Sequence, residues 1–132
     1  VSLFPDSKVV SEMRGAPGQP AIAVEFDLEG RRFLAVNGRP GAGFTDACSI
    51  VVTCDTQADI DRYWNALTAG GEEGQCGWLK DRFGVSWQVV PRQLPALIGG
   101  PDREAAGRAL QCMFGMKKLD IAALERARAG KA

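Results

Sequence analysis

The sequence contains no histidine, and this absence excludes more chemistry than any other feature of its composition. Histidine is the commonest metal ligand in proteins and the usual general base near neutral pH. Catalytic schemes in which histidine activates a serine or a cysteine nucleophile are therefore excluded.

The chain also lacks an excess of charge of either sign, because 16 acidic residues balance 16 basic ones. Nucleic acids and anionic membranes attract proteins with a basic patch, and this balance gives no sign of one. No apolar run approaches the roughly 20 residues that a membrane helix needs, and no signal-peptide pattern opens the chain. We therefore expect neither nucleic acid nor membrane among its partners.

No C-x-x-C pair occurs among the four cysteines, which are Cys48, Cys54, Cys76 and Cys112. Scattered cysteines in a chain of 132 residues are typical of small buried thiols in a reducing compartment, so we expect a cytoplasmic protein. A content of 45% hydrophobic and 24% charged residues is that of an ordinary soluble globular protein. The length suits a single domain with a real core.

The most informative stretch holds two short apolar segments, Cys76–Lys80 and Val85–Val90, joined by the sequence DRFG. Aspartate favours the opening of a turn and glycine suits a positive φ at its end, so we predict a β-hairpin here. Trp78 and Trp87 lie in its two strands, and tryptophan brings a large contact area. The hairpin is therefore expected to form both core and binding wall.

Alternating apolar and β-branched residues predict further strands on the N-terminal side of the hairpin. These strands cover Lys8–Met13, Ala21–Leu28, Arg31–Val36 and Ala47–Thr53. The opening residues Val1–Phe4 resemble the last turn of an apolar helix that Pro5 stops.

Three helices are also expected. Thr56 can cap the first, which carries an apolar stripe at helical spacing and ends at Gly70-Gly71. The stripe consists of Ile60, Tyr63, Trp64 and Leu67. After a connection over Pro91–Pro101, a second helix is expected to begin at Pro101, with Phe114 in its apolar stripe. The third follows Asp120, which can cap it, and runs to about Ala129.

The order of these elements indicates an internal repeat. The second half of the chain reads as a βαβββ unit, and the first half as the same unit without its leading strand and most of its helix. We expect one α+β domain made of a partial first unit (1–46), a second unit (47–91) and a C-terminal helical extension (92–132). We also expect residues ahead of Val1 that this sequence does not contain.

The block GGEEGQCGWLKDRFGVSWQVVP at residues 70–91 resembles the PhnB-like branch of the vicinal oxygen chelate superfamily, as do LFPDSKV, FLAVNG and LDIAALE. This superfamily includes glyoxalases, bleomycin-resistance proteins and extradiol dioxygenases. The resemblance implies the glyoxalase/bleomycin-resistance fold, in which paired βαβββ units form a cupped mixed sheet with the ligand on its concave side. It also implies a homodimer, in some members one that exchanges units between its two chains.

The resemblance also places the positions at which metal-using members carry His and Glu ligands. Here these positions hold Asn37, Ser49 and Gln88, and the strand that supplies the remaining ligand is missing. Neutral amide and hydroxyl oxygens are weak ligands for transition metals, so we expect neither a metal ion nor a cofactor.

The alternation of side chains between the two faces of each strand suggests a different use of the same positions. It puts Glu25, Asn37, Ser49 and Gln88 on the more polar face of their strands. If that face lines the cup, these side chains, together with the indole surfaces of Trp78 and Trp87, would hold a small polar or aromatic ligand. The plainer alternative is that Asn37 and Gln88 only satisfy nearby backbone groups.

Two functions therefore stay open. One is a metal-free, dimeric small-molecule-binding protein. The other is an isomerase- or lyase-type enzyme with Glu25 as the base and Gln88 or Asn37 polarising a carbonyl. Members of this branch are often labelled 3-demethylubiquinone methyltransferase, but the glycine cluster Gly38–Gly43 leads into no predicted helix that could hold a nucleotide-like cofactor.

Overall fold

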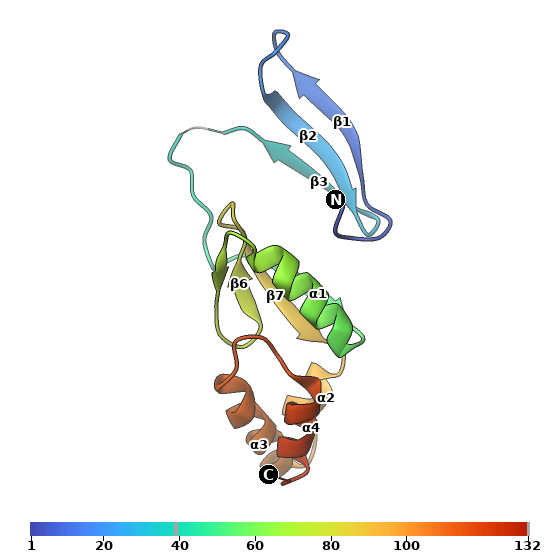
Figure 1. Ribbon diagram of the computed structural model, residues 1–132, viewed down its shortest axis with the longest axis vertical. Helices are drawn as coiled ribbons and strands as arrows, with labels where there is room; N and C mark the ends of the chain where they lie inside the picture. Colours follow the sequence, from blue (N-terminus) through green and yellow to red (C-terminus); the bar gives the residue numbers. More distant parts are fainter. Residues whose placement is uncertain (39, 132) are drawn as a thin grey trace. The chain divides into compact units, whose positions relative to one another are not determined.

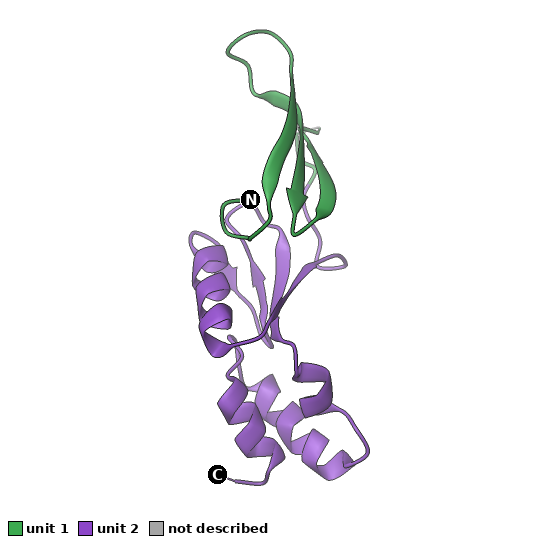
Figure 2. Ribbon diagram, turned by 90° about the vertical axis from the view of Figure 1, so that its right-hand side faces the viewer, with its two compact units in different colours: residues 1–42 green, residues 43–132 purple. Residues whose placement is uncertain are grey.

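The computed structural model describes residues 1–38 and 40–131. The chain divides into two compact units, residues Val1–Ala42 and Gly43–Ala132, which Figure 2 shows in different colours. In the described part of the chain, no helix has the length and hydropathy needed to cross a bilayer.

The first unit is an antiparallel sheet of three strands in the order β1-β2-β3 (Figure 1). Its strands are β1 (Lys8–Arg14), β2 (Ala21–Leu28) and β3 (Arg31–Val36), which agrees closely with the expected ranges. Glu29 and Gly30, which join β2 to β3, both have positive φ, at 46° and 78°. Two successive positive φ values match the twist of a tight hairpin.

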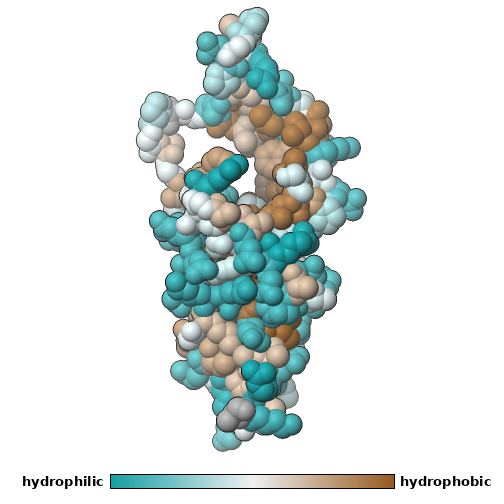
Figure 3. Space-filling model, viewed as in Figure 1, coloured by the Kyte–Doolittle hydropathy of each residue, from teal (hydrophilic) through white to brown (hydrophobic). Residues whose placement is uncertain are grey.

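One face of this sheet is mostly apolar, and the other, called the charged face, combines an ion-pair cluster with the exposed Leu34 and Val36. On the apolar face, Phe26 lies opposite Phe33 and their rings stack with centroids 5.5 Å apart. On the charged face, Arg32 pairs with Glu25 at 2.7 Å and with Asp27 at 2.6 Å. Every residue of β1 is exposed, and Figure 3 shows hydrophobic surface gathered over the sheet. The described residues of the unit therefore leave much apolar area in contact with solvent.

The second unit begins with the expected βαβββ order. Its strands β4 (Ile50–Cys54), β5 (Glu72–Glu73), β6 (Trp78–Lys80) and β7 (Ser86–Pro91) form a sheet in the order β4-β7-β6-β5. The parallel pair β4 and β7 is connected through α1 (Gln57–Thr68), as a parallel crossover requires. The short strand β5 is too brief to show a periodicity, and sequence analysis did not identify it.

Helix α1 covers one face of this sheet. Thr56 caps it by accepting the Asp59 N–H, and the four residues of the predicted stripe are all buried. The strands alternate, so Val52, Leu79 and Val89 point toward α1 and are buried. We call this side the helix-covered face. We call the opposite side, which carries Val51, Trp78, Lys80 and Gln88, the open face.

The β6–β7 turn is organised by Asp81. Its Oδ1 accepts the N–H groups of Phe83 at 2.9 Å and of Val85 at 3.0 Å, and its Oδ2 accepts Nε1–H of Trp87 at 3.0 Å. Gly84 closes the turn with φ of 86°. The hairpin and the roles of its first and last turn residues are confirmed.

Three helices follow β7, namely α2 (Leu94–Ile98), α3 (Arg103–Phe114) and α4 (Ile121–Arg128). They enclose a second apolar cluster of Leu97, Met113, Leu119 and Leu124. Asp120 caps α4 as predicted. Two other expectations were wrong: α2 occupies the predicted connection, and α3 begins at Arg103 after its cap Asp102, not at Pro101. Phe114, in the predicted stripe of this helix, is 54% exposed.

Three smaller expectations also need correction. Residues Val1–Phe4 form a single turn closed by Phe4 N–H to Val1 O and not the end of a helix. Strand β4 begins at Ile50, three residues later than the predicted Ala47. Cys48 is exposed, whereas Cys54 is buried and Cys76 and Cys112 are half-buried.

The turn between β5 and β6 joins the sheet to the C-terminal helices. The N–H groups of Cys76 and Gly77 donate to the carbonyls of Met116 and Lys117, both at 2.7 Å, and Gly77 O accepts the Val89 N–H at 2.8 Å. Gly77 has φ of 85°. A Cβ at this position would lie 2.8 Å from Val89 O and 3.2 Å from Leu119 Cδ1. Only glycine fits both the conformation and the space.

We expect the substitution Gly77→Ala to destabilise the second unit by roughly 3 kcal/mol or more, since backbone strain and overpacking act together. Gly84→Ala is the matched control, because Gly84 has nearly the same φ but its added Cβ would meet only Phe44 at 3.9 Å. We expect it to cost about 1–2 kcal/mol from conformation alone. Urea unfolding followed by circular dichroism measures both; equal losses would contradict the close approach at Gly77.

Candidate functional site

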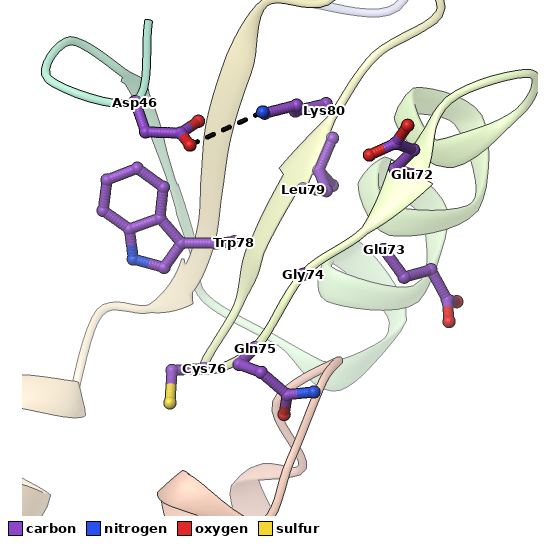
Figure 4. A pocket seen from close by; sticks show the side chains of 9 residues that line it. All are labelled: Asp46, Glu72, Glu73, Gly74, Gln75, Cys76, Trp78, Leu79 and Lys80. Atoms are coloured by element: carbon purple, nitrogen blue, oxygen red, sulfur yellow. Dashed lines mark ion pairs between the residues drawn. The ribbon is translucent and has the colours of Figure 1, made fainter.

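The open face carries a groove of about 500 Å³ (Figure 4). It lies entirely within the second unit, at the β5–β6 edge of the sheet and beside the loop that precedes β4. The lining residues are Asp46, Glu72, Glu73, Gly74, Gln75, Cys76, Trp78, Leu79 and Lys80. A volume in this range suits a small organic molecule.

Trp78 supplies the largest apolar surface of the groove. Strand alternation puts it on the open face with Lys80, while Leu79 between them turns to the helix-covered face and is buried. The indole is half-buried, and its Nε1–H has no hydrogen-bond partner among the described residues. Trp78 therefore offers both an aromatic face and an N–H donor to a ligand.

Asp46 and Lys80 form an ion pair across one end of the groove, with Nζ and Oδ2 3.4 Å apart. Ser86 Oγ–H donates to the other Asp46 oxygen, Oδ1, at 2.7 Å. This hydrogen bond, followed by the charge of Lys80, lowers the pKa of Asp46 below its usual value. Asp46 therefore keeps its negative charge over the whole physiological range.

The other end of the groove carries Glu72 and Glu73. Glu73 accepts Nε1–H of Trp64 at 3.1 Å and pairs with Lys117 at 3.5 Å; the hydrogen bond from Trp64 is the main reason why its pKa is lowered. Glu72 is exposed, and its carboxylate has no hydrogen bond or ion pair within the described residues. Glu73 thus belongs to the structure of the unit, while Glu72 is available to a ligand.

Cys76 lies at the bottom of the groove, in the turn between β5 and β6. Its backbone adopts a positive φ of 57°, and its Sγ–H donates to the Met113 carbonyl at 3.6 Å. The thiol therefore links this turn to α3.

Two of the predicted ligand-binding residues, Ser49 and Gln88, lie together. Gln88 is on the open face in register with Trp78, and its Nε2–H donates to Ser49 Oγ at 2.9 Å. They continue the same face but do not line the groove. Their mutual hydrogen bond satisfies part of their polar capacity without a ligand.

The structure puts the other predicted residues elsewhere. Trp87 is buried on the helix-covered face, away from the face that carries Gln88. Glu25 and Asn37 belong to the first unit, where Asn37 Nδ2–H donates to Ala21 O. The pairing of β2 with β3 continues through a hydrogen bond from the Asn37 N–H to the Ile22 carbonyl. This register puts Asn37 on the face of the sheet opposite to that of Glu25. The expectation that Glu25 and Asn37 share a polar face was therefore wrong.

Glu25 is held by two partners. Arg32 donates to it at 2.7 Å and Ser11 at 3.2 Å, and the hydrogen bond from Arg32 is the largest cause that lowers the pKa of Glu25. A carboxylate with a lowered pKa is a weaker base than a free one.

The donors at the superfamily's ligand positions do not fit a divalent transition metal. Asn37 and Gln88 each direct their amide N–H to a partner within the fold, and Ser49 offers only a neutral hydroxyl. Within the described ranges 1–38 and 40–131, no three Cys, Asp or Glu side chains are grouped so that they could hold a metal ion.

Sequence reasoning missed the charged residues of the groove. Lys80 could have been found from its two-residue spacing to Trp78, which puts both on one face. Asp46 has no such signal, because its place beside Lys80 depends on the loop before β4. Glu72 and Glu73 were considered only as carboxylates that a metal site would have to recruit, and Glu72 was not placed in the pocket because the two-residue strand β5 was not identified.

Comparisons with known proteins agree with this architecture. The sequence profile of the family described as 3-demethylubiquinone-9 3-methyltransferase matches residues 1–90. The chain is similar to the solved structure of a PhnB protein from Bacillus cereus described by the same activity, with a TM-score of 0.62, 32% identity, and coverage of 68% of this chain and 83% of that chain. A protein from Pseudomonas aeruginosa shares the fold with a TM-score of 0.53 and 22% identity, over 67% of this chain and 80% of that one. No curated protein sequence matches the chain.

We expect Ser86→Ala to raise the pKa of Asp46, since it removes the strongest of the contacts that lower it. A lowered folded-state pKa stabilises the protein above the unfolded-state pKa, and this contribution is lost as the pH falls through the folded-state pKa. In the variant, protonation of Asp46 should therefore begin at a higher pH. A carboxyl ¹³C NMR titration measures this. Ser49→Ala is the control on the same face, and an unchanged Asp46 titration in Ser86→Ala would contradict the assignment.

Proposed function

Because the chain belongs to the PhnB-like family described as 3-demethylubiquinone-9 3-methyltransferase, we propose that it is a metal-free small-molecule-binding protein whose ligand occupies the groove on the open face. The observation that carries this proposal is the half-buried indole of Trp78, which faces a cavity of about 500 Å³ with its N–H unused by the described residues. An aromatic wall with a few polar groups around it is the usual make-up of a ligand pocket.

The rim of the groove supports binding by hydrogen bonds and charge. Asp46 and Lys80 are 64% and 45% exposed in their side chains, so a ligand can reach both. Gln88 and Ser49 extend the polar part of the same face beyond the groove. The donor set at the superfamily's ligand positions is neutral, which favours recognition by shape and hydrogen bonding over coordination to a metal.

Methyl transfer is not part of the proposal, although the family description names it. A nucleotide-like methyl donor is commonly held where a strand runs through a glycine-rich turn into a helix. In the described part of the chain, β3 is followed by the strand β4 and not by a helix. Arg39, in the segment between the two strands, lies outside the described residues. Nor does an observation favour proton transfer by Glu25, whose carboxylate is engaged with Arg32 and Ser11.

The proposal includes a cytoplasmic homodimer. The four free cysteines suit a reducing compartment. The three-stranded sheet exposes apolar side chains such as Ile22, at 48%, on the face that carries the stacked pair Phe26 and Phe33. An apolar sheet face of this kind is stabilised when a second copy covers it. The proposed dimer does not require the two copies to exchange units.

We expect Trp78→Ala to abolish ligand binding while the fold is kept, because Trp78 is half-buried and belongs to neither apolar cluster. The measurement is a thermal-shift screen with a library of small aromatic and polar compounds, followed by calorimetry of any hit, with a chelator present throughout. A hit should raise the melting temperature of the native protein and not that of the variant.

Phe83→Ala is the matched control, since Phe83 is an aromatic residue exposed to 69% at the hairpin turn and outside the groove. It should bind every hit as the native protein does. Hits that survive Trp78→Ala, or a library that gives hits only when the chelator is left out, would contradict the proposal.

We expect sedimentation equilibrium to give about twice the 14.1 kDa chain mass, and Ile22→Glu to reduce it to that of one chain, because a buried carboxylate is costly at an apolar interface. Leu34→Glu is the control; Leu34 is 66% exposed on the charged face of the same sheet, opposite Glu25. A monomeric native protein, or dissociation by both substitutions alike, would contradict dimerisation through the apolar face.

A further inference from the structure

The groove differs in charge from the rest of the chain. Its lining contains three carboxylates, Asp46, Glu72 and Glu73, and one amine, Lys80, although the whole chain carries equal numbers of acidic and basic residues. The charges inside ion pairs cancel in part: Lys80 neutralises Asp46, and Lys117 neutralises Glu73. The carboxylate of Glu72 remains, so the groove has a local excess of negative charge.

Part of this charge lies beside an aromatic ring. Figure 4 shows the indole of Trp78 and the carboxylate of Asp46 on the same flank of the groove, with Lys80 reaching Asp46 from the other side. The tryptophan face is the strongest attractor of cations among aromatic side chains, because its π-system carries negative charge. A carboxylate at the rim of such a face adds a second attraction for the same ligand.

From this arrangement we propose that the ligand of the groove is a small organic cation that carries a quaternary or protonated amine on an aromatic or aliphatic body. The inference rests on the proposed binding function and specifies its ligand class. The cation would lie against the Trp78 indole, with Asp46 and Glu72 supplying opposite charge from the two ends of the groove.

Other charge types fit less well. An anion could pair with Lys80, but the carboxylates of Asp46 and Glu72 in the same groove would repel it. A neutral aromatic molecule could stack on Trp78 but would gain nothing from Glu72. The Asp46–Lys80 pair is exposed and loose at 3.4 Å, so a cation can approach Asp46 at little cost to the pair.

The experiment is an NMR titration of the full ¹⁵N-labelled chain at low ionic strength with three matched probes: benzyltrimethylammonium, benzyl alcohol and phenylacetate. The signal is the indole N–H peak of Trp78, assigned as the peak that disappears in Trp78→Phe. We expect benzyltrimethylammonium to shift this peak saturably, with a Kd on the order of tenfold lower than that of either other probe. Added salt should weaken the preference.

Two conservative variants test the carboxylates. Asp46→Asn keeps an oxygen for Ser86, and Glu72→Gln keeps the size of its side chain. Each should raise the Kd of the cation by roughly threefold and leave that of benzyl alcohol unchanged. Glu104→Gln, an exposed acidic residue in the first turn of α3 and outside the groove, is the control and should change neither.

The outcomes separate the two proposals. Equal binding of all three probes, or tightest binding of phenylacetate, overturns the cationic class while the groove remains a binding site. Failure of every probe to move the Trp78 peak overturns both. Preference for the cation that is unaffected by Asp46→Asn and Glu72→Gln also overturns the charge argument.

Discussion

The second unit depends on one close approach of backbones at Gly77. At this point the turn between β5 and β6 donates to the segment after α3, accepts from β7 and lies against Leu119. Buried backbone groups need such partners, and here they are supplied by β7 and by the segment after α3, which lies far from this turn in the sequence. The positive φ of Gly77 makes this possible, so the sheet and the C-terminal helices share one constraint.

The same constraint determines the shape of the groove. Cys76 and Gly77 precede Trp78 directly, and their hydrogen bonds to Met116 and Lys117 fix the point at which β6 begins. The register of β6 against β7 then decides which side chains face solvent. A shift of one residue would bury Trp78 under α1 and expose Leu79, so the open indole is a consequence of the turn.

Much of this fold could be predicted from the sequence, and the parts that could not share a physical cause. Helix α1 and the hairpin were predicted closely, because their signals, a capped apolar stripe and a DRFG turn, are local. The short elements α2 and β5 have too few residues for periodicity. Phe114 follows the helical pattern but is exposed, and it does not belong to the apolar cluster that the three helices enclose.

The candidate site shows the same division. Parity correctly put Ser49 and Gln88 on one face, and they bond to each other there. The same alternation puts Trp87, the neighbour of Gln88, on the opposite face, so the two residues could not both line one cup; Trp87 is buried on the helix-covered face.

The polar residues at the superfamily's ligand positions add little specificity to the groove. Gln88 and Ser49 satisfy one another, and Asn37 donates to a backbone carbonyl of its own sheet. Polar groups with partners inside the fold gain less from a ligand than groups without them. In the proposed binding function, discrimination between ligands would fall to the groups without a partner among the described residues, which are the indole N–H of Trp78 and the carboxylate of Glu72. With amides and a hydroxyl at these positions, the proposed recognition of a ligand rests on the shape and charge of the neighbouring surface.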